Sequence, residues 1–144
     1  NFIDVDKLKV AHEGSSINTI FKNKGESYFR KIEMDITLSE LRNKNSVISL
    51  GGGAFLTNVI RKNSKKYSTS FWLDVPLDEL IRRLKKNNKR PLIFLKKNSN
   101  EEIKKIYFKR KKIYNEADYR IRCKSLKSYE IVDRILNLYE KSGN

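Results

Sequence analysis

Two aspartates, Asp4 and Asp6, end a short run in which apolar and acidic residues alternate. In parallel α/β sheets, ligand sites lie at the carboxyl ends of the strands. Two carboxylates at such a place can orient a metal ion or accept a proton from a substrate hydroxyl. The same residues can instead be turn-forming aspartates that cap the following helix. The sequence leaves both interpretations open.

Three consecutive glycines, Gly51, Gly52 and Gly53, follow the apolar run Val47-Ile48-Ser49-Leu50 directly. Because they carry no side chains, a ligand ring can lie against their backbone and bond its amides. A tight turn between a strand and a helix is the alternative, but a turn needs fewer than three glycines. The pattern therefore favours the close approach of a ligand.

Two arginines stand where a cation could meet an anionic ligand. Arg30 and Glu33 are three residues apart, close enough on one helical face to pair. Such a pair is either surface decoration or a device that holds the guanidinium for a bidentate grip on a carboxylate. Arg110 falls on a helical stripe expected to be buried, where an arginine is costly unless it meets an anion. It therefore either extends to solvent or faces a bound carboxylate or phosphate.

A third arginine, Arg90, precedes Pro91 in a polar, basic stretch over 87–100. Proline stiffens this segment, as a lid that delivers a cation to phosphates would require. An exposed loop arginine is the alternative. The only histidine, His12, has no cysteine or acid at ligand spacing, so we interpret it as a helix-surface residue and find no zinc-type ligand cluster.

The elements that would position these residues alternate between strands and helices, which predicts an α/β fold with a parallel sheet. Short apolar or alternating runs predict strands over 2–6, 47–50, 70–73 and 119–123, and the run 47–50 reads as a buried strand. Helical spacing predicts a helix after Gly25 that buries Phe29, Ile32, Ile36 and Leu41, and further helices over 77–84 and 103–114. A last helix is expected to start at Ser128 as N-cap, with Ile131, Ile135 and Tyr139 facing inward.

Composition limits the classes of function without choosing one. The 144 residues suit a single domain, and no apolar run approaches the ~20 residues of a membrane span. A single cysteine fits a reducing, cytoplasmic location. The net charge of +15 favours anionic partners, but a lysine-rich solvated surface explains most of it equally well. The basic stretches also lack the interleaved aromatic residues that stack on nucleic-acid bases.

Taken together and in order, these motifs resemble those of the shikimate kinases. Each motif alone is modest, but the ordered combination is specific and spans nearly the whole chain. The matching stretches are Phe2-Ile3-Asp4-Val5-Asp6, Gly14-x-Ser16-Ile17-x-x-Ile20-Phe21, Gly25-Glu26-x-x-Phe29-Arg30-x-Ile32-Glu33, Val47-Ile48-Ser49-Leu50-Gly51-Gly52-Gly53-Ala54, Arg61, Arg90-Pro91-Leu92 and Arg110-x-x-x-Tyr114-x-x-x-Ala117-Asp118.

The resemblance implies an enzyme that phosphorylates the 3-hydroxyl of shikimate with ATP and Mg²⁺, in the chorismate pathway of aromatic amino acid biosynthesis. Asp6 would hold the reacting hydroxyl and accept its proton. Arg30, oriented by Glu33, and Arg110 would clamp the shikimate carboxylate. Gly51, Gly52 and Gly53 would form the floor under the ring.

The resemblance also implies roles at the nucleotide. Arg90 would be the lid arginine that reaches the transferring phosphate, with Pro91 and Arg83 near the adenine. Asp4 would help to place magnesium through water. We accordingly expect one domain over 1–144, with a shikimate-binding region over 7–45 and a lid loop over 86–100.

The implied fold is a three-layer, P-loop NTPase-like fold with a parallel sheet in the order 2-3-1-4-5. Family members begin with a strand and a GxxxxGK[ST] loop, and no such sequence occurs in these 144 residues. We therefore expect the first, central strand to be missing here. Two buried strand edges would then be exposed, so we expect the 144 residues alone to be inactive and poorly stable.

Other functions remain possible on the sequence alone. Another small-metabolite kinase, such as a gluconate kinase, would not obviously need both Arg30 and Arg110 for one carboxylate. A basic nucleic-acid-binding module would show salt-sensitive binding and no response to shikimate. A degenerate remnant would have little reason to keep the acceptor residues. We expect a monomer that acts on shikimate, without a nucleic-acid or membrane partner.

Overall fold

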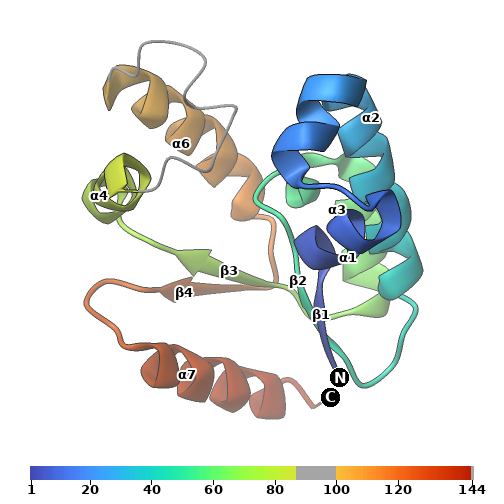
Figure 1. Cartoon of the computed structure of the whole chain (residues 1–144). Coiled ribbons are helices and arrows are strands. Elements are labelled where there is room, and N and C mark those ends of the chain that lie inside the picture. The colour runs from blue at the N-terminus through green and yellow to red at the C-terminus, as the bar shows by residue number, and fades with distance from the viewer. Residues whose placement is uncertain (87–99, 144) are drawn as a thin grey trace. The chain divides into compact units, whose positions relative to one another are not determined.

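The structure, a computed structural model, describes residues 1–86 and 100–143. The chain forms two compact units, Asn1–Ser68 and Thr69–Asn144. Figure 1 shows the elements of each unit along the chain. Whether residues 1–144 act as one domain, with a shikimate-binding region over 7–45, stays a prediction.

The first unit combines a small parallel sheet with three α-helices. Its sheet pairs Phe2 with Val47, Ile3 with Ile48 and Asp4 with Ser49. The elements in chain order are β1 (Phe2–Asp4), α1 (Val5–Glu13), α2 (Ile17–Glu40), β2 (Val47–Ser49), the 3₁₀ helix η1 (Ala54–Leu56) and α3 (Asn58–Tyr67). A parallel pair needs a crossover connection, which α1 and α2 provide (Figure 1).

The boundary between β1 and α1 differs from the predicted strand over 2–6. The strand ends at Asp4, and Val5 and Asp6 already belong to α1. Asp4 is the N-cap: its Oδ1 accepts hydrogen bonds from the backbone N–H groups of Asp6 (3.0 Å) and Lys7 (3.2 Å). These bonds satisfy donors that a helix start leaves unpaired. The capping interpretation is therefore correct for Asp4.

Helix α2 is kinked at Gly25, whose dihedral angles (φ 78°, ψ 174°) are not helical. A residue with a Cβ is strained in this region, so glycine suits the position. The predicted apolar face after the kink is confirmed, because Phe29, Ile32 and Leu41 are all less than a tenth exposed. Ile20, before the kink, is buried as well.

The second unit repeats the parallel arrangement. Strands β3 (Phe71–Asp74) and β4 (Tyr119–Arg122) pair in register from Phe71↔Tyr119 to Asp74↔Arg122. The helices are α4 (Leu77–Lys86), α6 (Asn100–Tyr114) and α7 (Ser128–Lys141). Trp72, Ile103 and Ile121 are buried. The helices predicted over 77–84 and 103–114 are confirmed. The strand predicted at 70–73 is shifted by one residue, and the strand predicted at 119–123 ends one residue earlier.

A partly buried ion pair links the two strands of the second sheet. Arg120 donates to Asp74 Oδ2 through Nε (2.8 Å) and Nη2 (2.5 Å). The guanidinium also lies over the Trp72 ring, 4.8 Å from its centroid. An arginine is well suited to such combined pairing and stacking. The pair joins neighbouring parallel strands at the carboxyl end of β3.

The last helix differs from prediction in two details. Ser128 is the first residue of α7 and not its N-cap, and the backbone N–H of the preceding Lys127 donates to Glu130 Oε2 at 2.7 Å. Ile131 and Ile135 are half-buried as expected, but Tyr139 is 43% exposed. Leu138, one residue earlier, is half-buried. Residues three or four apart on a helix share a face. The half-buried face of α7 therefore runs through Ile131, Ile135 and Leu138.

Two further expectations concern the sheet. The pairs β1–β2 and β3–β4 correspond to neighbours 2-3 and 4-5 of the expected order. A central strand between these pairs stays a prediction. The expected burial of the run 47–50 is wrong, since Val47 is 68% exposed. Among the described residues β2 pairs with β1 alone, so its other edge has no neighbouring strand.

None of the helices in 1–86 and 100–143 has the length and apolarity needed to cross a membrane.

Candidate functional site

Charged side chains from α1 and α2 meet in the first unit. Asp6 lies in the first turn of α1, and Lys9 follows one turn later. Lys9 Nζ lies 2.7 Å from Asp6 Oδ1 and 2.8 Å from Glu33 Oε1 on α2. Arg30 Nη1 donates to the other oxygen of the same carboxylate, Glu33 Oε2, at 2.7 Å. The result is a continuous chain of ion pairs from Asp6 to Arg30.

Burial differs sharply along this chain. The side chains of Lys9 and Glu33 are 0% and 3% exposed, whereas that of Asp6 is 48% exposed. Arg30 is intermediate, with its side chain 28% exposed. The two outer groups can therefore be reached from solvent, while the two inner groups hold them. The predicted pairing of Arg30 with Glu33 is confirmed.

The triple-glycine loop lies directly against this ion-pair chain. A Cβ placed on Gly51 would lie 2.8 Å from Glu33 Oε1 and 3.0 Å from Asp6 Oδ1. A Cβ placed on Gly53 would overlap the Arg30 guanidinium. A side chain at either position would therefore have to displace these charged side-chain ends. The loop, with Gly52 between these residues, brings bare backbone next to a carboxylate and a guanidinium.

Arg61, another residue of the shared motifs, holds the segment that follows this loop. Its Nη1 donates to the carbonyl oxygens of Phe55 (3.0 Å) and Leu56 (2.8 Å) in and at the end of η1. Ala54, at the start of η1, is fully buried. The C-terminal end of the glycine loop is thus anchored by α3, on which Arg61 lies.

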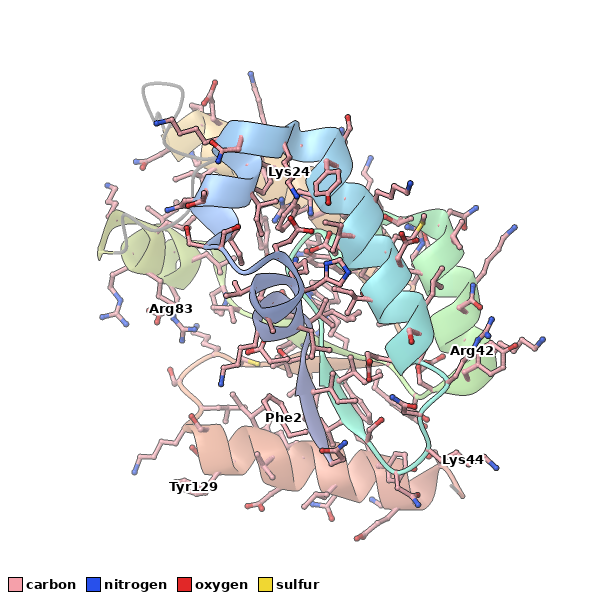
Figure 2. The ribbon with its side chains drawn as sticks, turned by 45° about the vertical axis from the view of Figure 1, so that its right-hand side comes forward. Phe2, Lys24, Arg42, Lys44, Arg83 and Tyr129 are labelled. Atoms are coloured by element: carbon pink, nitrogen blue, oxygen red, sulfur yellow. The ribbon has the colours of Figure 1, made fainter. Side chains whose placement is uncertain are left out.

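A second cluster joins α1 to the part of α2 around the kink at Gly25. Lys24 Nζ lies 2.6 Å from Glu13 Oε2, and the Tyr28 hydroxyl donates to Glu13 Oε1 at 3.0 Å. The hydrogen bond from Lys24 is the main cause that lowers the pKa of the Glu13 carboxyl below 4.5, with smaller contributions from Tyr28 and His12. Figure 2 shows Lys24 on this part of α2. His12 is 63% exposed, as expected for a helix-surface residue.

The metal role of Asp4 stays a prediction. Its capping bonds engage one carboxylate oxygen, Oδ1, which is compatible with a contact to magnesium through water, since Mg²⁺ keeps several waters in protein sites. Across 1–86 and 100–143, no three histidine, cysteine or acidic side chains gather as a ligand set.

The remaining predicted residues belong to the second unit or lie outside the described residues. Arg110 lies on α6 and is half-buried, so its convergence with Arg30 stays a prediction. Arg83 extends from α4 (Figure 2), with its side chain 63% exposed and its Nε 2.7 Å from Glu79 Oε1. Arg90, Pro91 and most of the expected lid over 86–100 fall in 87–99, outside the described residues.

Lys9 is the residue of this site that sequence reasoning missed. A lysine in a helix with both apolar and charged residues is normally predicted to be exposed, because lysine is almost never fully buried unless it is paired. The available signal was the spacing, since Asp6 and Lys9 are three residues apart on one helix. Nothing in the spacing indicated that Glu33, 24 residues further along, would complete the pair.

Comparisons with known proteins agree on one family. The family model described as shikimate kinase matches residues 1–140. A curated shikimate kinase from Persephonella marina is 43% identical over 135 residues, covering 94% of this chain and 80% of the relative. One from Sulfurihydrogenibium is 39% identical, with 94% and 80% covered.

Solved structures show the same similarity in three dimensions. The shikimate kinase of Aquifex aeolicus superposes with a TM-score of 0.83 at 33% identity, over 99% of this chain and 81% of that one. That of Acinetobacter baumannii, solved in complex with shikimate, gives 0.90 at 24% identity, over 99% and 79%, and supports the fold alone. The fold is thus the P-loop NTPase-like fold of these kinases, which are phosphotransferases. On these grounds the chain belongs to the shikimate kinase family.

Proposed function

We propose that this protein transfers a phosphoryl group from ATP to the 3-hydroxyl of shikimate. The family membership supports a nucleotide-dependent kinase. The observation that carries the choice of acceptor is the ion-pair chain from Asp6 to Arg30, set against the glycine loop. It places a carboxylate and a guanidinium together, as an acceptor with both a hydroxyl and a carboxylate requires.

Asp6 receives the reacting hydroxyl in this proposal. Lys9 holds its Oδ1, and the side chain is 48% exposed, so Oδ2 can accept a hydrogen bond from the hydroxyl. That bond orients the hydroxyl oxygen toward the phosphorus, and the carboxylate takes up the proton as the new O–P bond forms. Phosphoryl transfer needs little covalent chemistry from the protein, so positioning of this kind is the main task.

Arg30 binds the carboxylate of shikimate. Glu33 fixes the guanidinium through Nη1 at 2.7 Å, whereas the exposed Glu26 lies 3.5 Å from both Nε and Nη2. In this proposal the substrate carboxylate replaces that long contact and binds the planar fork in a bidentate manner. Arg110 is proposed as the second cation of this clamp. The ring of shikimate is proposed to lie against the backbone of Gly51, Gly52 and Gly53.

Arg90, Pro91 and Arg83 are proposed to serve the nucleotide, and Asp4 to place magnesium through water. When bound, ATP with Mg²⁺ supplies the phosphoryl group, and the metal neutralises charge on the phosphates. A cation such as Arg90 would stabilise charge on the transferring group. Exclusion of water by a lid over this region would favour transfer over hydrolysis.

Shikimate-dependent release of ADP tests the proposal. The assay uses the longest form of the protein that its coding sequence encodes, with an Arg30→Ala variant and the 144 residues alone beside it. We expect turnover that requires shikimate and falls at least about a hundredfold in kcat/KM in Arg30→Ala, a loss of ~2.7 kcal/mol. Gluconate serves as the competing acceptor. Turnover with gluconate but not with shikimate would assign a different acceptor and contradict the proposal.

A further inference from the structure

The roles proposed above leave the ammonium group of Lys9 without a function. Its side chain is 0% exposed, and the residue is among the largest fully buried side chains of the described part of the chain. Lysine is strongly hydrated in water, so its burial is costly unless each donor finds a partner. A lysine in this position therefore calls for a physical reason.

The surroundings of the ammonium satisfy it completely. Its Nζ contacts Asp6 Oδ1 at 2.7 Å and Glu33 Oε1 at 2.8 Å. The Phe29 ring takes the third side, with its centroid 4.0 Å from the nitrogen. An ammonium has three donors, and an aromatic face is a favourable neighbour for a cation. Lys9 thus has no free donor and no exposed surface with which to touch a substrate.

We propose that Lys9 is a positioning residue of the acceptor site, whose ammonium holds Asp6 and Glu33 and keeps Arg30 available to the carboxylate of the acceptor. This inference rests on the proposed function. Lys9 acts through its neighbours: through Asp6 on the reacting hydroxyl, and through Glu33 on the guanidinium.

The division of Glu33 between two cations carries the argument. One oxygen, Oε1, accepts from Lys9 and the other, Oε2, from Arg30. Without Lys9, both oxygens turn to Arg30, because a carboxylate and a guanidinium favour two parallel bonds. The guanidinium would then be occupied by Glu33, and its bidentate grip on shikimate would be lost.

Charge balance acts in the same direction. Asp6 and Glu33 contribute two negative charges, which Lys9 and Arg30 balance, and the exposed Glu26, 3.5 Å from Arg30, adds a third carboxylate. Removal of the ammonium adds one further negative charge to this network, beside an anionic substrate. In wild type, Asp6 and Glu33 both contact Lys9 Nζ. Without that nitrogen, the two carboxylates are neighbouring like charges that repel each other.

The test is shikimate binding by Lys9→Met, which keeps the length of the side chain and removes its charge. Isothermal titration calorimetry without nucleotide should show Kd for shikimate raised at least about tenfold. Steady-state kinetics should show a lower kcat and a higher KM for shikimate, with KM for ATP within about twofold of wild type. Lys7→Met is the matched control, because Lys7 is exposed on the same helix, and it should bind shikimate as wild type does.

A double variant separates positioning from simple support of the fold. Glu33→Gln removes the carboxylate that competes for Arg30, so adding it to Lys9→Met should cost less than the sum of the two single losses in shikimate affinity. The double variant also avoids an unpaired buried carboxylate, which protects its folding. Circular dichroism confirms that each variant is folded before binding is measured.

The outcomes are distinct. If wild type neither binds nor phosphorylates shikimate, the proposed function fails. If wild type binds shikimate and Lys9→Met binds it equally well, or if the losses of Lys9→Met and Glu33→Gln simply add, the inference on Lys9 fails alone. If the single and the double variant both lose their fold, Lys9 serves the fold only, and the inference is likewise overturned.

Discussion

At the scale of single residues, Gly53 decides where Arg30 can lie. Its backbone has an ordinary φ of −106°, so an alanine would fit the chain conformation. The space is the obstacle, because the guanidinium of Arg30 occupies the position of the missing Cβ. A flexible side-chain end can move away, and the fold would survive the change. The substrate-binding role proposed for Arg30 would be impaired.

We therefore expect Gly53→Ala to raise KM for shikimate about tenfold or more, which is ~1.4 kcal/mol of binding. The displaced guanidinium would lose its alignment with the substrate carboxylate, while thermal stability changes little. Steady-state kinetics and thermal melting together measure both effects. Ser49→Ala, an exposed residue shortly before the loop, should leave both unchanged. A normal KM in Gly53→Ala would contradict the role given to Arg30.

The residues of this site were predictable where spacing along one helix determines the contact. Arg30 and Glu33 pair as their separation of three residues indicated. The burial of Lys9 was not predictable, because it depends on Glu33, which approaches from another helix. The contact between the glycine loop and these charges is likewise a matter of tertiary packing. Spacing alone carries no information on either contact.

At the scale of elements, Glu13 couples α1 to α2. Its side chain is 4% exposed and binds Lys24, which lowers the pKa of the carboxyl below its usual 4.5. A carboxyl whose pKa is lower in the folded state stabilises the fold at pH values above its unfolded pKa. This stabilisation disappears as the pH falls through the folded pKa. The contact should therefore matter near neutral pH and not in acid.

Thermal melting of Glu13→Gln should reveal this dependence. We expect the variant to melt below wild type at about pH 7, and the gap to shrink as the pH falls through the lowered pKa of the folded state, where the wild-type carboxyl takes up a proton as well. Glu101→Gln is the comparison, because Glu101 makes an exposed pair with Lys104 and is itself 68% exposed. Its effect should be smaller, as for surface pairs in general. A gap for Glu13→Gln that is constant with pH would rule out the ionised contact.

The elements themselves were predictable in type and order, less so at their ends. The strand β1 was extended too far, because Val5 fits a strand by its side chain although Asp4 already caps the helix. In α7, Tyr139 was predicted to face inward, but the preceding residue, Leu138, takes that position and Tyr139 is exposed. The burial of Val47 was overpredicted, since burial depends on neighbouring strands and not on the run itself.

At the scale of the whole molecule, the net charge of +15 acts on substrates from a distance. Shikimate and ATP are both anions, and a positive field raises their rate of encounter with the protein. Salt screens this field, because the Debye length falls from about 30 Å at 0.01 M to about 8 Å at 0.15 M. The charge is thus expected to affect capture of the substrates more than the chemical step.

We expect kcat/KM for shikimate to fall several-fold between about 0.01 M and about 0.15 M KCl, with kcat nearly constant. Uncharged viscogen at matched concentration controls for effects of diffusion. Salt-sensitive binding to DNA would be expected of any basic protein, so it would not by itself indicate a nucleic-acid function. A kcat/KM that does not respond to salt would show that the surface charge serves another purpose.

The kink at Gly25 has a consequence for which substitutions the chain can accept. Apart from its chain neighbours and nearby helix backbone, no atom of the described residues lies within 4 Å of a Cβ placed there, whereas the φ of 78° is one that side-chain-bearing L-residues rarely adopt. Substitution of Gly25 is therefore disfavoured by its positive φ, whereas substitution of Gly53 is disfavoured by contact with the Arg30 guanidinium. In a mutational scan read out by stability, alanine, serine and leucine at position 25 should all be penalised to a similar degree, of roughly 1–3 kcal/mol. At position 53 the penalty on substrate binding should instead grow with the volume of the side chain.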